Sequence, residues 1–190
     1  MSFKSIIKLM DIKTLVAGIV PVILGSIYSK YAFGKFNILY FILLIVAMIL
    51  IQSATNMVND YSDFKSGADN KKSGNEKALV SGEITSKQVL VTIFLFQLIA
   101  CMIGIFIASQ TSYYILIVAI IGGIISISYA FGPFPISYTP FGEAVAGITM
   151  GIGITTTVIY IQSGAINLNT FLVAIPTVIY ISTILLSNNI

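Results

Sequence analysis

Six apolar runs, each close to the length that crosses a lipid bilayer, constrain the fold of this chain more than any other feature. A helix needs about 20 apolar residues to cross the hydrocarbon core. Inside that core the backbone must satisfy its own hydrogen bonds, as a helix does. Only 9% of the 190 residues are charged, against about 25% in a soluble domain. We therefore predict an all-α fold, a polytopic transmembrane helix bundle. The predicted spans are Leu15–Ser29, Phe36–Val58, Val89–Ala108, Tyr113–Phe131, Ala144–Ile161 and Phe171–Leu186.

The ionisable residues exclude several classes of function. All ten cationic side chains are lysines, and the chain has no histidine. Metal sites and general bases built on histidine are therefore excluded. The single cysteine, Cys101, lies within an apolar run, so no disulfide can form within the chain. The few lysines provide no basic surface for nucleic acid, and we expect a lipid bilayer as the partner instead.

The lysines also predict the orientation in the membrane. With the N-terminus inside, eight lysines fall on the inner side and two, Lys30 and Lys35, on the outer side. This distribution satisfies the positive-inside rule. We therefore predict a multi-pass protein of the cell membrane with a cytoplasmic N-terminus and a cytoplasmic loop at about residues 59–87. The inner lysines are Lys4, Lys8, Lys13, Lys65, Lys71, Lys72, Lys77 and Lys87.

The second predicted span ends in a cluster of asparagine and aspartate. If the helix continues past its apolar run, these residues lie three or four positions apart and share one face. Ionisable groups at the mouth of a membrane helix are costly and mark a functional site by default. Their oxygen atoms suit Mg²⁺, which binds through a few carboxylates and shares its other positions with phosphates. A solvated loop would also carry acidic and basic residues here, but this spacing favours a site. The cluster comprises Asn56, Asn59, Asp60 and Asp63.

Residues 59–69, Asn-Asp-Tyr-Ser-Asp-Phe-Lys-Ser-Gly-Ala-Asp, resemble the first aspartate-rich motif of the UbiA superfamily of membrane prenyltransferases. The form of the motif, with Asp-Phe-Lys followed by Gly-Ala-Asp, is similar to that of the 1,4-dihydroxy-2-naphthoate prenyltransferases of menaquinone synthesis. Three further blocks agree with the family in the same order, within residues 13–25, 80–84 and 133–143. The resemblance thus extends over essentially the whole chain.

This resemblance implies a bundle of nine transmembrane helices around a central cavity, with two aspartate-rich motifs facing each other at its cytoplasmic mouth. In the family, Mg²⁺ ions bridge these motifs to a prenyl diphosphate. Its ionisation gives an allylic cation that the aromatic acceptor attacks. We expect residues 1–190 to form a single domain of this type, covering its N-terminal two-thirds and about six of the nine spans. The chain ends just before the second motif would begin. We therefore expect these residues alone to be inactive or nearly so.

The resemblance also assigns the metal ligands. It implies that Asn59 and Asp63 bind Mg²⁺ and that Asp60 is the acid adjacent to them. Asp60 and Asp63 are thus the predicted catalytic pair. Asp69 matches a later acid of the motif, and the predicted metal ligands are Asn59, Asp60, Asp63 and Asp69.

Three residues are predicted to contact the substrates, a polyprenyl diphosphate and an aromatic acceptor of the naphthoate type. Lys77 lies where the family has a basic residue that could reach phosphate. Asn56, at the start of the polar cluster, and Tyr129, at the end of the fourth span, complete this set. For Tyr129 an interfacial anchor is the alternative, since tyrosine is common at membrane surfaces.

Other functions remain open at this stage. Within the family, the acceptor could be of the 4-hydroxybenzoate or haem type, although the form of the aspartate motif favours naphthoate. Outside it, the chain could be an inactive truncated remnant or a transporter-like protein. Transporters place substrate sites near the bilayer midplane. Here the charges lie at the cytoplasmic end of a span, which favours chemistry at the membrane surface.

Overall fold

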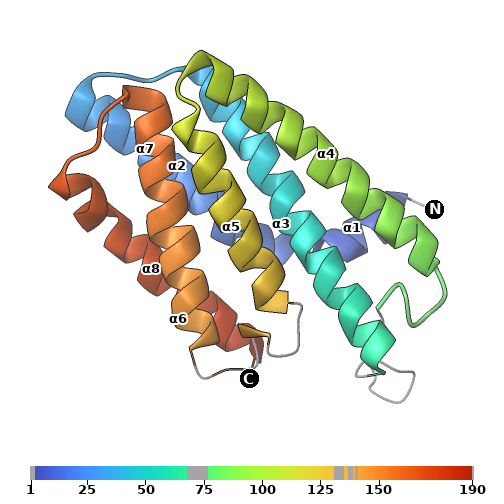
Figure 1. Cartoon of the computed structure of the whole chain (residues 1–190). Coiled ribbons are helices and arrows are strands. Elements are labelled where there is room, and N and C mark those ends of the chain that lie inside the picture. The colour runs from blue at the N-terminus through green and yellow to red at the C-terminus, as the bar shows by residue number, and fades with distance from the viewer. Residues whose placement is uncertain (1–2, 68–76, 131–134, 137–138, 140, 190) are drawn as a thin grey trace.

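The computed structural model of the chain describes residues 3–67, 77–130, 135–136, 139 and 141–189. Across these residues the chain is helical and contains no strand. Helices α2 to α8 form a bundle, and the short helix α1 lies at its side (Figure 1). The elements are α1 (Phe3–Met10), the 3₁₀ turn η1 (Ile12–Leu15), α2 (Val16–Phe33), α3 (Ile38–Ser66), α4 (Ser86–Gln110), α5 (Tyr114–Ala130), α6 (Gly142–Gly147), the π-helix η3 (Ile148–Ile154), α7 (Thr155–Ser163) and α8 (Leu168–Asn189).

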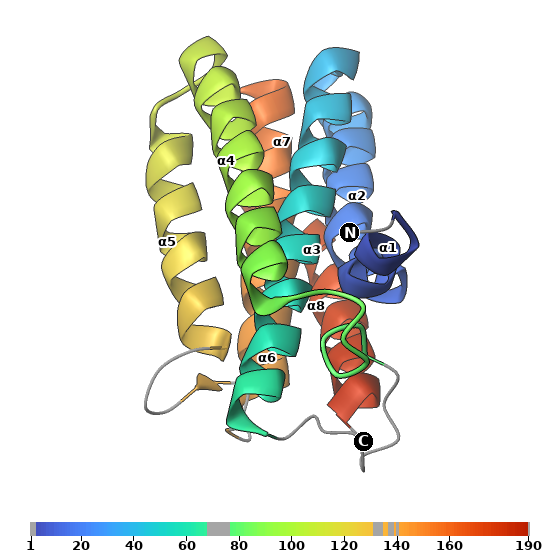
Figure 2. The same ribbon diagram turned by 90° about the vertical axis from the view of Figure 1, so that its right-hand side faces the viewer.

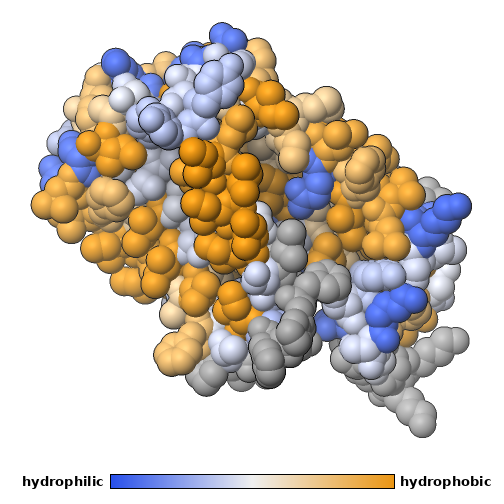
Figure 3. Space-filling model, viewed as in Figure 1, coloured by the Kyte–Doolittle hydropathy of each residue, from blue (hydrophilic) through white to orange (hydrophobic). Residues whose placement is uncertain are grey.

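The predicted polytopic helical bundle is confirmed. Within the described part of the chain, five helical segments are long and apolar enough to cross a membrane. The predicted fourth span forms α5, a helix of 17 residues that is shorter than the other five. In Figure 3 hydrophobic side chains cover most of the middle of the visible face, and hydrophilic ones gather mainly toward its ends. The five spans are Ile12–Phe33, Ile38–Ser66, Ser86–Gln110, Gly142–Ser163 and Leu168–Leu186.

The helices pack against neighbours along the chain, and α2 also packs against distant elements: α7, α8 and η3. α3 packs along α4, whereas α2 packs against α7 and α3, and α8 packs against α6 and η3. Figure 2 shows α3, α4 and α5 side by side, which agrees with their contacts. We call the end of the bundle that holds the last turns of α3 the site end. α1 lies toward this end, where it contacts α3.

Helix α3 is longer than its apolar run. It begins at an Asn37 cap, whose side chain accepts hydrogen bonds from the backbone N–H groups of Leu39 and Tyr40. It ends at Gly67, which adopts a left-handed conformation with φ of 78°. Its 29 residues correspond to about 43 Å, more than the hydrocarbon thickness of about 30 Å. Because the polar residues of α3 lie in its last turns, we expect the excess length to project beyond the hydrocarbon at the site end.

This length corrects the predicted loop at residues 59–87. Residues 59–66 are helical, so the connection to α4 begins only after Ser66. Polar side chains do not end a helix by themselves, and here the glycine cap does so. The helix thus continues through residues 59–66 of the aspartate-rich motif, as the predicted shared face requires.

The fifth and sixth spans meet through glycine. A Cβ atom added to Gly151 would lie 2.6 Å from the backbone nitrogen of Val178 and 2.7 Å from its Cα atom. The Thr177 hydroxyl oxygen lies 3.2 Å from the Gly151 carbonyl oxygen. It also lies 3.3 Å from the Thr155 hydroxyl. Small residues permit such close helix approach in lipid, where van der Waals packing drives association.

Replacing Gly151 with alanine is therefore expected to destabilise the protein. The clash is with the backbone of α8, which cannot rotate away, and overpacking of this kind costs about 1–3 kcal/mol. Gly153→Ala is a matched control, because nothing lies within 4 Å of a Cβ atom built there. Thermal unfolding in detergent should show a lower Tm for Gly151→Ala than for Gly153→Ala. Equal values would contradict this packing.

Candidate functional site

An ion-paired cluster lies at the end of α3. The ammonium group of Lys77 is 2.9 Å from the Asp60 carboxylate and 3.6 Å from the Asp63 carboxylate. The side chains are 31% exposed for Lys77, 23% for Asp60 and 36% for Asp63. Asp60 and Asp63 are three residues apart on one helix, which places them on the same face. A single cation thus bridges both predicted catalytic carboxylates.

Asn59 belongs to the same stretch of α3. It lies four residues before Asp63, so both side chains start from the same face of the helix. Asp69 falls outside the described residues. In the part of the chain that the structure describes, no group of three or more histidine, cysteine, aspartate or glutamate residues is placed to hold a metal. The described donors are therefore two carboxylates and one amide.

This donor set fits Mg²⁺ that is shared with a phosphate ligand. Mg²⁺ takes oxygen ligands, and it is often held by only one or two protein carboxylates together with substrate phosphates and water. Ser62, in the same turn of α3, has a buried hydroxyl with no hydrogen-bond partner among the described residues. Buried hydroxyls without a partner are uncommon. Ser62 lies two residues from Asp60, about 200° around the helix axis, so its hydroxyl starts from a different face and does not add to this donor set.

Asn56 is tied to the start of the chain. Its amide nitrogen donates hydrogen bonds to the Met10 carbonyl and to the Thr14 hydroxyl, both at 2.7 Å. These contacts hold the corner between α1 and η1, where Asp11 has φ of 46°. An amide nitrogen has two hydrogens to donate, and both are used here. Asn56 thus anchors the N-terminal segment to α3, and only its carbonyl oxygen is left for the predicted substrate contact.

Tyr129 lies at the site end of α5. One turn earlier, the Ser126 hydroxyl is 3.5 Å from the hydroxyl of Thr55 on α3. Because α3 and α5 run in the same direction (Figure 1), Asn59 and Tyr129 each lie about one turn beyond this contact. Tyr129 is partly buried and lies within the electrostatic reach of Glu143 at the start of α6. It therefore faces the same end of the bundle as the ion-paired cluster.

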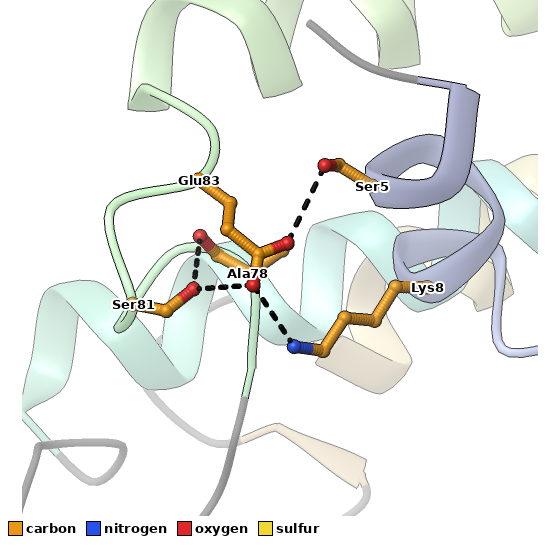
Figure 4. A network of polar contacts seen from close by, with 5 residues as sticks. All are labelled: Ser5, Lys8, Ala78, Ser81 and Glu83. Atoms are coloured by element: carbon orange, nitrogen blue, oxygen red, sulfur yellow. Dashed lines mark hydrogen bonds and ion pairs between the residues drawn. The ribbon is translucent and has the colours of Figure 1, made fainter.

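The turn that carries Lys77 is held against α1 by Glu83. The Glu83 carboxylate accepts hydrogen bonds from Lys8 at 3.3 Å, from Ser81 at 3.1 Å and from Ser5 at 3.4 Å (Figure 4). The Lys8 hydrogen bond is the main reason why the pKa of Glu83 is lowered, and the Ser81 hydroxyl adds to it. Sequence reasoning gave Glu83 no role. The only signal was its place in residues 80–84, because its partner Lys8 is 75 positions away.

A sequence profile of the UbiA prenyltransferase family matches residues 18–190. The 1,4-dihydroxy-2-naphthoate octaprenyltransferase of Bacillus subtilis is 36% identical over 178 residues, which is 93% of this chain and 57% of that protein.

Vertebrate relatives are more distant. UbiA prenyltransferase domain-containing protein 1 of Xenopus tropicalis is 29% identical, over 91% of this chain and 50% of that protein. The human protein of the same name is 28% identical, over 91% of this chain and 52% of its own length. The chain thus spans about half the length of the curated relatives that it matches.

Proposed function

Because this chain belongs to the UbiA prenyltransferase family, we propose that it carries the diphosphate-binding side of a Mg²⁺-dependent prenyl transfer site. The reaction moves a polyprenyl group from its diphosphate to an aromatic acceptor. The proposed acceptor is 1,4-dihydroxy-2-naphthoate, in menaquinone synthesis, because the relative from Bacillus subtilis bears that name. The observation that carries the proposal is the placement of Lys77 between Asp60 and Asp63 at the end of α3.

Asp60, Asp63 and Asn59 would hold the metal, and Asp69 would add a further carboxylate. When bound, Mg²⁺ neutralises charge on the diphosphate as it leaves carbon. Lys77 already sits at the carboxylates as a counter-ion. When the metal and the diphosphate arrive, its ammonium group can turn from the carboxylates to the phosphate oxygens. Lysine suits this exchange because its charge is compact and its stem is flexible.

The position of the site suits a lipid-borne substrate. The hydrocarbon tail of a prenyl diphosphate would lie among the apolar helices, with the charged head at the site end. Lys30, in the last turn of α2, and Lys35, which donates to the Ser163 carbonyl at 2.9 Å, lie at the opposite end. With Lys8, Lys65 and Lys77 at the site end, the positive-inside rule favours a cytoplasmic site in the cell membrane. Asn56 and Tyr129 remain proposed substrate contacts.

An acceptor assay tests this proposal. The complete gene product, reconstituted in lipid nanodiscs, is incubated with a polyprenyl diphosphate and 1,4-dihydroxy-2-naphthoate in the presence of Mg²⁺. We expect a prenylated naphthalene product that disappears when EDTA is added and returns with excess Mg²⁺. A parallel reaction with 4-hydroxybenzoate should give little product. Preferred use of 4-hydroxybenzoate would overturn the acceptor, and no transfer to either compound by folded protein would overturn the proposed function.

A further inference from the structure

Residues 77–84, the turn that delivers Lys77 to the site, are closed by their own hydrogen bonds. The Ser81 N–H donates to the Lys77 carbonyl at 3.0 Å, and the Ile84 N–H donates to the Ala78 carbonyl at 3.3 Å. Gly82 supplies the left-handed residue of this turn, with φ of 76°. The Ser81 hydroxyl also contacts the Ala78 carbonyl, at 3.3 Å. Lys77 is thus the first residue of a compact turn that is closed by its own hydrogen bonds.

This turn is docked on α1 at two levels. Below the surface, Leu9 of α1 is buried in one cluster with Ala78, Leu79 and Ile84 of the turn. At the surface, the Glu83 carboxylate is the common acceptor for Ser5 and Lys8 of α1 and for Ser81 of the turn itself (Figure 4). Met57 of α3 closes the cluster from the other side. The turn therefore has α1 on one side and the helix of the two catalytic carboxylates on the other.

These contacts form a continuous path between α1 and the ion-paired cluster. The path runs from Lys8 to Glu83, from Glu83 to Ser81, and from the Ser81 N–H to the carbonyl of Lys77. The Lys77 ammonium group then reaches Asp60 at 2.9 Å. α1 is itself fixed to α3 one turn before Asp60, through the Asn56 amide. Thus the turn that carries Lys77 and the helix that carries Asp60 and Asp63 are both attached to α1.

We propose that Glu83 is a positioning residue for Lys77: by clamping the 77–84 turn to α1, it keeps the Lys77 ammonium group where a diphosphate can be bound. This inference rests on the proposed function, and it adds that α1 is part of the binding machinery. The Glu83 carboxylate is held by Ser5, Lys8 and Ser81. Its effect is therefore transmitted through the turn.

Charge reversal across the clamp tests this inference. Lys8→Glu and Glu83→Lys each place like charges together, whereas the double variant restores an attractive pair with reversed sign. Lys13→Glu is the control, because Lys13 is an exposed lysine close to α1 and makes the same charge change. Each protein is reconstituted in nanodiscs, and Mg²⁺-pyrophosphate binding is measured by calorimetry. The rate at which an amine-acylating reagent modifies Lys77 is measured by mass spectrometry, relative to exposed Lys87.

We expect both single variants to bind Mg²⁺-pyrophosphate roughly fivefold more weakly, the size expected for an exposed ion pair, and to acylate Lys77 faster. The double variant should regain the wild-type affinity for Mg²⁺-pyrophosphate and the wild-type acylation rate of Lys77. Lys13→Glu should change neither quantity. In turnover, the single variants should raise KM for the prenyl diphosphate and leave kcat nearly unchanged. Wild-type values for binding and acylation in the single variants would overturn the inference. Faster acylation with unchanged binding would also overturn it, since Glu83 would then hold the turn without serving the ligand.

The two readouts separate this inference from the proposed function. A wild-type protein that binds no Mg²⁺-pyrophosphate would contradict the proposed function. The acylation rates would still show whether Glu83 determines the position of Lys77, because that measurement needs no ligand.

Discussion

Replacing Asp63 with asparagine is expected to lower prenyl transfer by at least about 100-fold. Asparagine keeps the size of the side chain but removes the negative charge that would hold Mg²⁺ against the diphosphate. Asp60→Asn should have an effect of similar size, since Lys77 bridges both carboxylates. The measurement is the initial rate in the nanodisc assay at a Mg²⁺ concentration that just saturates the wild-type protein. Raising the Mg²⁺ concentration should recover part of the lost rate, because the variant binds the metal more weakly.

Asp11→Asn is the matched control for these variants. Asp11 is exposed, its side chain makes no capping hydrogen bond, and its left-handed conformation is one that asparagine also adopts. It should keep nearly the full rate. If Asp63→Asn and Asp11→Asn retained equal activity, the metal site would not lie at the end of α3.

Replacing Lys77 with methionine is expected to weaken Mg²⁺-pyrophosphate binding by about 10- to 100-fold, the range for loss of a charge-assisted hydrogen bond. Methionine keeps much of the length of the side chain and removes only its charge. Affinity for Mg²⁺ alone should not fall, because Asp60 and Asp63 would lose a competing cation. Calorimetric titrations with Mg²⁺ and with Mg²⁺-pyrophosphate would measure the two effects separately.

Lys87→Met provides the comparison for this change. Lys87 is an exposed lysine in the first turn of α4. Its replacement should leave both affinities unchanged. Equal pyrophosphate affinities for the Lys77→Met and Lys87→Met proteins would remove Lys77 from the binding site.

Much of the site was predictable because it is local in sequence. Asp60 and Asp63 lie three residues apart, and a continuous helix is enough to place them on one face. The continuation of that helix to Ser66 was not predictable from the apolar run alone, and the predicted loop at residues 59–87 was therefore wrong in its first residues. Hydropathy locates the part of a helix that lies in lipid and does not mark where the helix ends in water.

The role of Asn56 shows the limit of such reasoning. Its place in the polar cluster predicted a substrate contact, and that contact remains a prediction. The structure adds two hydrogen bonds from its amide to Met10 and Thr14, more than 40 positions earlier in the chain. Side chains of one type at one spacing can serve a ligand or a neighbouring segment. Only the positions of distant residues distinguish between these uses.

The sequence by itself determined that the chain folds as membrane-spanning helices, because a backbone in hydrocarbon must satisfy its hydrogen bonds locally and apolar runs of sufficient length meet that requirement. It also determined which helix carries the acidic cluster. The tertiary structure alone decided that Lys77 sits between Asp60 and Asp63 and that Glu83 joins its turn to Lys8 of α1. These contacts join segments that are distant in sequence, and they depend on the packing of the helices and the turn around Leu9 and Met57.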